Sequence, residues 1–243
     1  MVDGGYLKRD FVTNPIGEQV SAAVVETISR KDWPELIRHH EKNKSSCLDV
    51  HYFHDVPILN QAHLKYCWLF CVAAGVANRL AHQGIDPVPT LSATATAARV
   101  KKYRNVGGYV LEGAVGVEKY GLPSVDVWPQ GKLYRKYEND PELVTSGEKN
   151  KLVAFSELPS RDFEALASVL LNEKNPRPVA IALPWWKHAV LALQVCKGRN
   201  TFGVVYANSY GEQWGDRGFG ILWGKKALAH EQIVINDVTA RSE

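Results

Sequence analysis

The sequence is poor in cysteine, in net charge and in long apolar segments. Only four cysteines occur in 243 residues, far below the density of a small disulfide-stabilised scaffold. The 29 Lys and Arg residues exceed the 26 Asp and Glu residues by three, too small an excess to indicate a protein that binds the phosphate backbone of nucleic acids. The longest apolar run, Trp68 to Ala77, is about half of the roughly 20 residues that a membrane-spanning helix needs. We therefore expect no nucleic-acid partner, no membrane partner and no disulfide framework.

Signals for export and for cofactors are also missing. Met1 to Asp10 is polar, contains a Gly-Gly pair and leads into no apolar stretch of secretory length. This predicts a cytoplasmic, reducing location, with packaging in a virion as a further option, and cysteines that stay thiols. No Gly-rich phosphate loop is present, and the neighbouring His39 and His40 lack a metal-ligand spacing. We expect neither a cofactor nor a metal ion.

The chain changes from mainly helical patterns to mainly β patterns, which predicts an α+β fold. Residues 1–50 are expected to form an N-terminal extension with a helix at about 18–31 and a solvated charged stretch at 35–44, followed by an extended segment at 51–61. Further helices are expected from Cys67 onward and at 92–102, 109–120 and 161–172. Strands are expected at 179–183, 189–196, 201–207 and 219–223.

Cys67 has a position that suits a nucleophile. It begins a run that is apolar on every face, and such a run is typical of a helix enclosed by the rest of the protein. Backbone N–H groups and the helix dipole at a helix N-terminus favour a thiolate over a thiol. Cys71, one turn further along, is expected to be a core thiol.

A thiolate that attacks carbonyl groups needs a histidine partner, a group that orients the histidine and donors for the oxyanion. His188 is the best candidate among eight histidines, because it alone begins an apolar strand. Asn208 closes a later β run, and its amide could orient the His188 ring. Gln61 lies six residues before Cys67 and could donate to the oxyanion together with the Cys67 backbone N–H.

These residues and their neighbours resemble the papain-like cysteine peptidases. The segment Pro57-Ile58-Leu59-Asn60-Gln61, followed by Cys67-Trp68, matches that family in residues and in spacing. Further similarities follow in the family's order and extend from about Val56 to Trp223. They are Leu91-Ser92, Gly107-Gly108-Tyr109, Glu118 to Pro123, His188-Ala189-Val190, Asn208-Ser209, Trp214-Gly215 and Gly218-Phe219.

The resemblance implies a papain-like domain over 51–243, with a helical lobe at about 58–125. A β lobe would span about 126–243 plus the segment 51–57, with an active-site cleft between the lobes. It implies a Cys67-His188-Asn208 triad, a Gln61 oxyanion site and substrate contacts from Gly107, Gly108 and Trp214. The substrate would be a peptide or protein, hydrolysed at a peptide or isopeptide bond through an acyl-thioester.

The sequence departs from the family beside the proposed catalytic residues. Lys65 and Tyr66 replace the usual Gly-Ser before the nucleophile, and we expect them to narrow the primary pocket. Lys187 precedes the histidine and should lower the population of the imidazolium. Only residues 184–187 join two strands that the family usually connects by a longer excursion.

The departures leave a second hypothesis open. The chain could be a catalytically impaired papain-like binding or assembly subunit, such as a phage or virion component, that docks on a protein partner through residues 1–50. Acyl transfer to an amine through the same thioester is a third option.

Overall fold

The computed structural model describes residues 4–13, 21–22 and 25–239. Seven α-helices and two short 3-10 helices occur in these residues together with one seven-stranded sheet. The α-helices are α1 (Trp33–Asn43), α2 (Cys47–Phe53), α3 (Cys67–His82), α4 (Ala93–Val100), α5 (Val110–Tyr120), α6 (Leu143–Glu148) and α7 (Phe163–Leu170). The 3-10 helices are η1 (Arg135–Asn139) and η2 (Gly224–Ala227).

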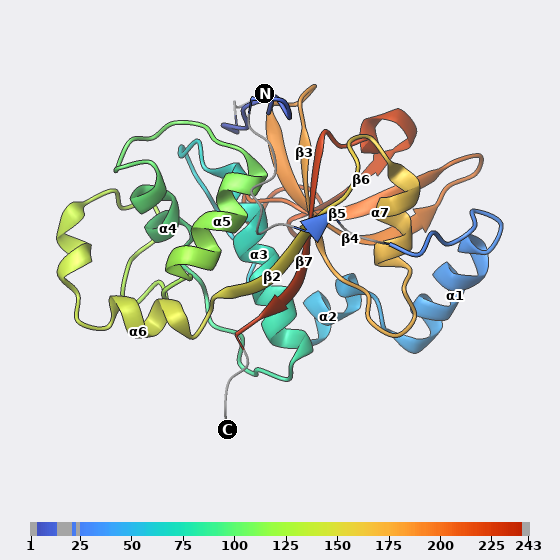
Figure 1. Cartoon of the computed structure of the whole chain (residues 1–243). Helices are drawn as coiled ribbons and strands as arrows, with labels where there is room; N and C mark the ends of the chain where they lie inside the picture. The colour runs from blue at the N-terminus through green and yellow to red at the C-terminus, as the bar shows by residue number, and fades with distance from the viewer. Residues whose placement is uncertain (1–3, 14–20, 23–24, 240–243) are drawn as a thin grey trace.

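The sheet has the strand order β1-β2-β7-β3-β4-β5-β6. Its strands are β1 (Ser21–Ala22), β2 (Leu152–Glu157), β3 (Val179–Leu183), β4 (His188–Lys197), β5 (Phe202–Ala207), β6 (Phe219–Trp223) and β7 (Glu231–Val238). All neighbouring strands pair antiparallel except β1 and β2, which are parallel. Helices α4, α5 and α6 lie on one side of the molecule and the β4–β6 part of the sheet on the other (Figure 1).

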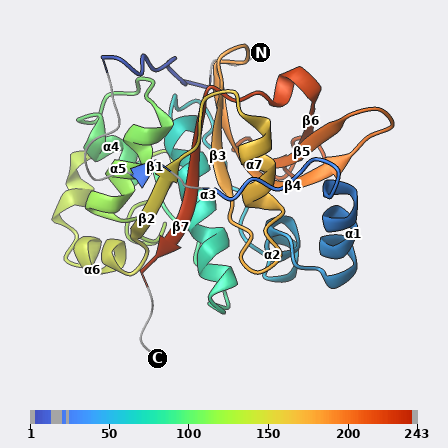
Figure 2. The ribbon, with the colours of Figure 1, turned by 45° about the vertical axis from the view of Figure 1, so that its right-hand side comes forward.

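The alternation of side chains along β3 explains how the sheet is covered on both faces. Val179, Ile181 and Leu183 belong to the core that contains α7 and Trp33 of α1. Ala180 and Ala182 point to the opposite face and belong to the core that contains α3. Because these alanine side chains are small, helix α3 with its bulky apolar side chains can approach the strands closely. Figure 2 shows α7 in front of the strands, α3 behind them and α1 at the right-hand edge.

Most helices and strands after residue 90 agree with the sequence expectation to within about three residues. Helices α4, α5 and α7 and strands β3, β4, β5 and β6 all occur where their patterns predicted them. Strands β2 and β7 have no counterpart in the expectation. They pair with each other, and β7 also pairs with β3.

The first fifty residues differ from the expectation. The helix expected at 18–31 falls partly outside the described residues, and residues 25–31 are not helical. The charged stretch 35–44 forms most of α1, which is not a solvated extension, because Trp33, Ile37 and His40 are buried. Residues 51–53 continue helix α2 and are not extended.

The predicted lobe boundary near residue 125 stays a prediction. Packing shows which segments on either side of it contact each other. Trp128 and Leu143 form a small buried cluster with Ala95 and Ala98 of α4, so the segment after residue 125 covers the helical side. Tyr6 is buried in the core that contains α3. Both ends of the described chain therefore contribute to the same packed unit, since β7 also joins this core.

Candidate functional site

Cys67 is the first residue of α3 and is fully buried. Its backbone N–H donates to the carbonyl oxygen of Gly4 at 3.3 Å. The preceding residue, Tyr66, is also fully buried, and its hydroxyl donates to the Arg104 carbonyl at 2.8 Å. The start of α3 is thus fixed by the core, and the thiol lies where the helix dipole favours negative charge. All four cysteines remain thiols, and burial raises the pKa of Cys71 well above its ordinary value.

His188 is the first residue of β4, and its ring is held by Asn208. The distance from His188 Nε2 to Asn208 Oδ1 is 2.7 Å. The backbone N–H of Ser209 also donates to Oδ1 at 2.8 Å, which identifies this atom as the amide oxygen. In the neutral ring, Nε2 must therefore carry the proton, and Nδ1 is left with a lone pair. Within the described part of the chain, Nδ1 is buried and has no hydrogen-bond partner.

Aromatic side chains enclose the His188 ring. Tyr210 stacks on it with a centroid separation of 4.7 Å, and Trp186 contacts it edge-on at 4.7 Å. Burial lowers the pKa of His188 to about 4, while the hydrogen bond to Asn208 acts in the opposite direction. The sequence expectation assigned such a lowering to Lys187, but its cause in the structure is burial.

Gln61 is oriented by its neighbours so that its amide N–H groups point toward the start of α3. Its Oε1 accepts a hydrogen bond from the Ser209 hydroxyl at 2.6 Å. Its Nε2 donates to the Leu64 carbonyl at 2.6 Å and to the Gly4 carbonyl at 3.2 Å. The Gly4 oxygen consequently accepts from two donors, the Gln61 amide and the Cys67 backbone, in the manner of an oxyanion site.

The Gly4 carbonyl belongs to a segment without helix, residues 4–11, which we call the N-terminal strap. Gly108 pairs with it in parallel, since the Gly108 N–H donates to the Gly5 carbonyl and the Leu7 N–H to the Gly108 carbonyl, both at 3.0 Å. The Tyr6 N–H donates to the Lys187 carbonyl at 3.3 Å. The strap thus lies between the walls that carry Cys67 and His188.

Two glycines allow the strap to come this close. A Cβ atom on Gly4 would lie 2.0 Å from His188 Nδ1, and a Cβ on Gly5 would lie 2.2 Å from the Lys65 carbonyl oxygen. Gly5 also has a φ of 92°, which residues with a side chain rarely adopt. The same crowding holds at Gly107, where an added Cβ would lie 2.3 Å from the Gly5 carbonyl oxygen.

Six of the seven residues predicted for the site lie together around the strap. They are Gln61, Cys67, Gly107, Gly108, His188 and Asn208. Trp214 instead belongs to the aromatic cluster that encloses His188. Its ring centroid lies 6.1 Å from that of Tyr210 and 6.2 Å from that of Trp186.

Lys65 and Tyr66, which the sequence predicts to narrow the primary pocket, differ in their surroundings, and Lys65 lines a hollow with Gly5, Gly107 and Lys187. The Tyr66 side chain lies in the core, and the Lys65 side chain is exposed. It is the backbone carbonyl of Lys65 that crowds Gly5. The short 184–187 connection is a turn that places His188 opposite Leu183 in the β3–β4 hairpin.

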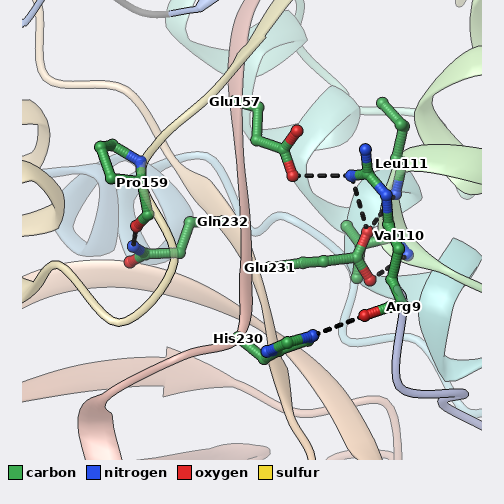
Figure 3. A network of polar contacts seen from close by, with 8 residues as sticks. All are labelled: Arg9, Val110, Leu111, Glu157, Pro159, His230, Glu231 and Gln232. Carbon is green, nitrogen blue, oxygen red and sulfur yellow. Dashed lines mark hydrogen bonds and ion pairs between the residues drawn. The ribbon is translucent and has the colours of Figure 1, made fainter. Parts of the chain in front are cut away.

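Sequence reasoning missed the strap and the ion pairs that anchor it. The guanidinium of Arg9 lies 2.7 Å from a Glu157 carboxylate oxygen and 3.5 Å from one of Glu231 (Figure 3). The only signal near the N-terminus was the Gly4-Gly5 pair, and nothing in its spacing relates it to Cys67. The acids lie more than a hundred residues from Arg9, so no local pattern indicates the contact.

The described residues form neither a metal site nor a membrane-spanning helix. In residues 4–13, 21–22 and 25–239, no three His, Cys, Asp or Glu side chains gather so as to hold a metal ion. None of the helices in these ranges combines the length and the apolar character needed to cross a membrane.

Comparisons with known proteins give similarity at the level of structure. No protein-family model matches the sequence, and no curated protein matches it. Xylellain, a cysteine protease from Xylella fastidiosa, is similar with a TM-score of 0.58 and 16% identity, over 75% of this chain and 83% of its own.

Two further structures show the same likeness. A digestive procathepsin L2 proteinase from the Tenebrio molitor larval midgut has a TM-score of 0.58 and 17% identity, over 95% of this chain and 73% of its own. The bromelain protease from Ananas comosus, in complex with an inhibitor, has a TM-score of 0.60 and 17% identity, over 77% of this chain and 95% of its own. The mixed helices and antiparallel sheet described above therefore form a papain-like fold.

Proposed function

We propose that the chain is a cysteine peptidase that hydrolyses peptide bonds through Cys67, His188, Asn208 and Gln61. The observation that carries this proposal is the Gly4 carbonyl, which accepts from the Gln61 amide at 3.2 Å and from the Cys67 N–H at 3.3 Å. A peptide carbonyl already lies at the helix start beside the thiol. The same two donors would stabilise the negative oxygen that forms when a carbonyl carbon is attacked.

The reaction follows from the roles these atoms can take. Nδ1 of His188 accepts the Cys67 proton, and the thiolate adds to the substrate carbonyl carbon to give a tetrahedral oxyanion. When this intermediate collapses, the C–N bond breaks and the imidazolium protonates the leaving amine. Water then adds to the thioester with His188 as base, which releases the carboxylic acid and regenerates the thiol. Asn208 keeps the ring oriented through both steps.

A substrate can enter only after the strap has left. Gly4 occupies the oxyanion site, and the backbone of residues 5–7 uses the hydrogen bonds of Gly108 and Lys187. Burial of His188 in this state favours its neutral form, because the pKa is lowered to about 4. Water entering the cleft after strap release would reduce this effect of burial.

The proposed peptidase activity can be tested with a variant whose strap binds the cleft less tightly. In Gly5→Ala the added Cβ meets the Lys65 carbonyl, so the strap should dissociate more often. We expect Gly5→Ala to cleave unfolded casein into peptides detected by mass spectrometry, and the Gly5→Ala, Cys67→Ala double variant to leave casein intact. Cleavage by the double variant would refute Cys67 as the nucleophile.

The filled cleft also favours the second hypothesis, a binding or assembly subunit without activity. The two functions differ in one outcome. If Cys67 of Gly5→Ala reacts readily with iodoacetamide but a broad mixture of peptides stays uncleaved, the accessible thiol is not a peptidase nucleophile. The binding subunit is then the better description.

A further inference from the structure

The anchor of the strap is a site for a guanidinium group that the rest of the fold builds. Arg9 is only 2% exposed, and its Nη1 lies 2.7 Å from Oε1 of Glu157 and 3.5 Å from Oε1 of Glu231. Figure 3 shows the guanidinium lying against both carboxylates. Glu157 is the last residue of β2, and Glu231 is the first residue of the neighbouring strand β7. Both acids therefore come from the sheet, and the cation alone comes from the strap.

The sheet and a helix hold the acids in place independently of Arg9. The backbone N–H groups of Val110 and Leu111, at the start of α5, donate to Glu231 at 3.2 and 3.3 Å. Glu231 is fully buried, and Glu157 is 6% exposed. In the described part of the chain, Oε2 of Glu157 is buried without a hydrogen-bond partner. The site therefore has acceptor capacity that the residues around it do not fill.

Strap release leaves these acids without their cation. Burial raises the pKa of both Glu157 and Glu231, while the charge of Arg9 opposes this shift in each. Removing the cationic partner from a buried ion pair is strongly unfavourable, because the remaining charge has lost its water as well. An open cleft consequently binds a cation better than a neutral group at this position.

The two carboxylates lie next to the point where the strap backbone pairs with Gly108. Tyr6 pairs with Gly108, and Val110, two residues further along, donates its backbone N–H to Glu231 at 3.2 Å, so the acid lies close to the residue seated on Gly108. Two carboxylates from adjacent strands suit a planar guanidinium with five donors better than a compact ammonium group. In the strap itself, Arg9 occupies the site, whereas the neighbouring Lys8 is exposed.

We propose that Glu157 and Glu231 form a binding site for an arginine side chain of an incoming peptide, and that Arg9 of the strap occupies this site until the peptide displaces it. The substrate class is thus peptides that carry arginine on the Gly107–Gly108 side of the cleft. The role of this site in substrate recognition rests on the proposed peptidase function, but arginine binding itself can be measured without catalysis.

The experiment uses the full chain with Cys67→Ala, Gly4→Ala and Arg9→Ala, which removes the nucleophile and weakens the strap. The probe is the fluorescein-labelled peptide Gly-Gly-Tyr-Leu-Lys-Arg-Asp-Phe, and its matched control has citrulline in place of arginine. We expect fluorescence anisotropy to show binding of the arginine peptide about tenfold tighter, the size of a charge-assisted hydrogen bond. Adding Glu231→Gln should reduce the difference below about twofold, while Glu212→Gln, at an exposed acid, should leave it unchanged.

Equal binding of both peptides, or an arginine preference that survives Glu231→Gln, would overturn the proposal. If Glu231→Gln does not fold because α5 loses one of its two acceptor oxygens, Glu157→Gln takes its place. A second measurement uses Arg9→Ala alone, whose melting temperature should rise more with ethylguanidinium than with ethylammonium. No difference between these two cations would also reject the site. A positive binding result with no cleavage of any peptide would leave the arginine site standing and refute the peptidase.

Discussion

At the scale of single residues, a chain of hydrogen bonds fixes the side-chain amides of Asn208 and Gln61. Ser209 donates its backbone N–H to Asn208 and its hydroxyl to Gln61. One residue thus orients the amide that holds His188 and the amide that donates to the Gly4 carbonyl, the proposed oxyanion site. Ser209 is a positioning residue that the sequence motif contained but did not explain.

The first prediction concerns access to the thiol. In Gly4→Ala the added Cβ would lie 2.0 Å from His188 Nδ1, a ring atom held in place by Asn208, so the strap must shift. We expect alkylation of Cys67 by iodoacetamide to accelerate at least about tenfold, because each 1.4 kcal/mol of lost strap binding changes the open population tenfold.

Lys8→Ala, at an exposed position of the same strap, is the control and should leave the alkylation rate unchanged. Peptide mapping identifies the labelled cysteine. An unchanged rate for Gly4→Ala would show that the strap does not limit access to Cys67.

A second residue-scale prediction separates positioning from folding. Ser209→Ala removes the hydroxyl from Gln61 but keeps the backbone bond to Asn208. In a Gly5→Ala background we expect kcat to fall more than tenfold while KM changes little, because the oxyanion donor is misoriented and ground-state contacts remain. A rise in KM at constant kcat would contradict a role for Ser209 through Gln61.

At the scale of elements, two helices begin in different ways, one with a local cap and one with a contact to the sheet. Helix α2 begins with a capping box, in which the Ser46 hydroxyl accepts from the Asp49 N–H and Asp49 accepts from the Ser46 N–H. Helix α5, by contrast, has no side-chain cap of its own at Tyr109 and uses Glu231 of β7. One helix start is therefore local and the other depends on the sheet.

The third prediction follows from the local cap. Ser46→Ala should destabilise the protein by about 1 kcal/mol, since it removes the acceptor from the first turn of α2 and the hydroxyl is buried. For a chain of this size we expect the melting temperature to fall by about 2–4 °C in thermal unfolding followed by circular dichroism. Ser160→Ala, at an exposed position, should show no change. A drop as large in the control as in Ser46→Ala would contradict this assignment.

The elements also show what the sequence can and cannot reveal. Cys67 and His188 could be predicted because each begins a strongly patterned element. Asn208 and Gln61 followed from their positions at the end of a β run and six residues before Cys67, and the family resemblance then supported all four. Strand β7 and the strap could not be predicted, since their places depend on contacts with residues far away in the chain. Helix α2 was missed because its capping signal at Ser46 precedes only seven helical residues.

At the scale of the whole molecule, acid should weaken the fold through its buried histidines. Burial lowers the pKa of His51 and of His188 to about 4. Each ring remains neutral in the folded chain but takes up a proton in the unfolded chain once the pH falls below about 6.5. The unfolded state then binds more protons, so stability is lost as the pH falls from about 6.5 to 4, on the order of 3 kcal/mol for each histidine.

The fourth prediction isolates one of these histidines. Glu157 and Glu231 titrate in the opposite direction, because their pKa values are raised in the folded state. We therefore compare His51→Gln with the wild type by urea unfolding between pH 7 and pH 4. The variant should lose less stability on acidification than the wild type, by on the order of 3 kcal/mol. Parallel curves would show that His51 does not couple folding to pH.

The strap has a further consequence for kinetics, because it is a ligand joined covalently to its own site. Its local concentration is fixed by the chain, in the millimolar range for short flexible connections, and does not change when the protein is diluted. A free peptide with the same contacts must reach comparable concentrations to displace it. A reagent that reacts irreversibly with Cys67 has no such threshold, since each brief opening traps one more molecule. Reversible inhibitors should therefore look weak against this chain even when their contacts are good, and reaction rates measured over hours will rank ligands more faithfully than equilibrium competition.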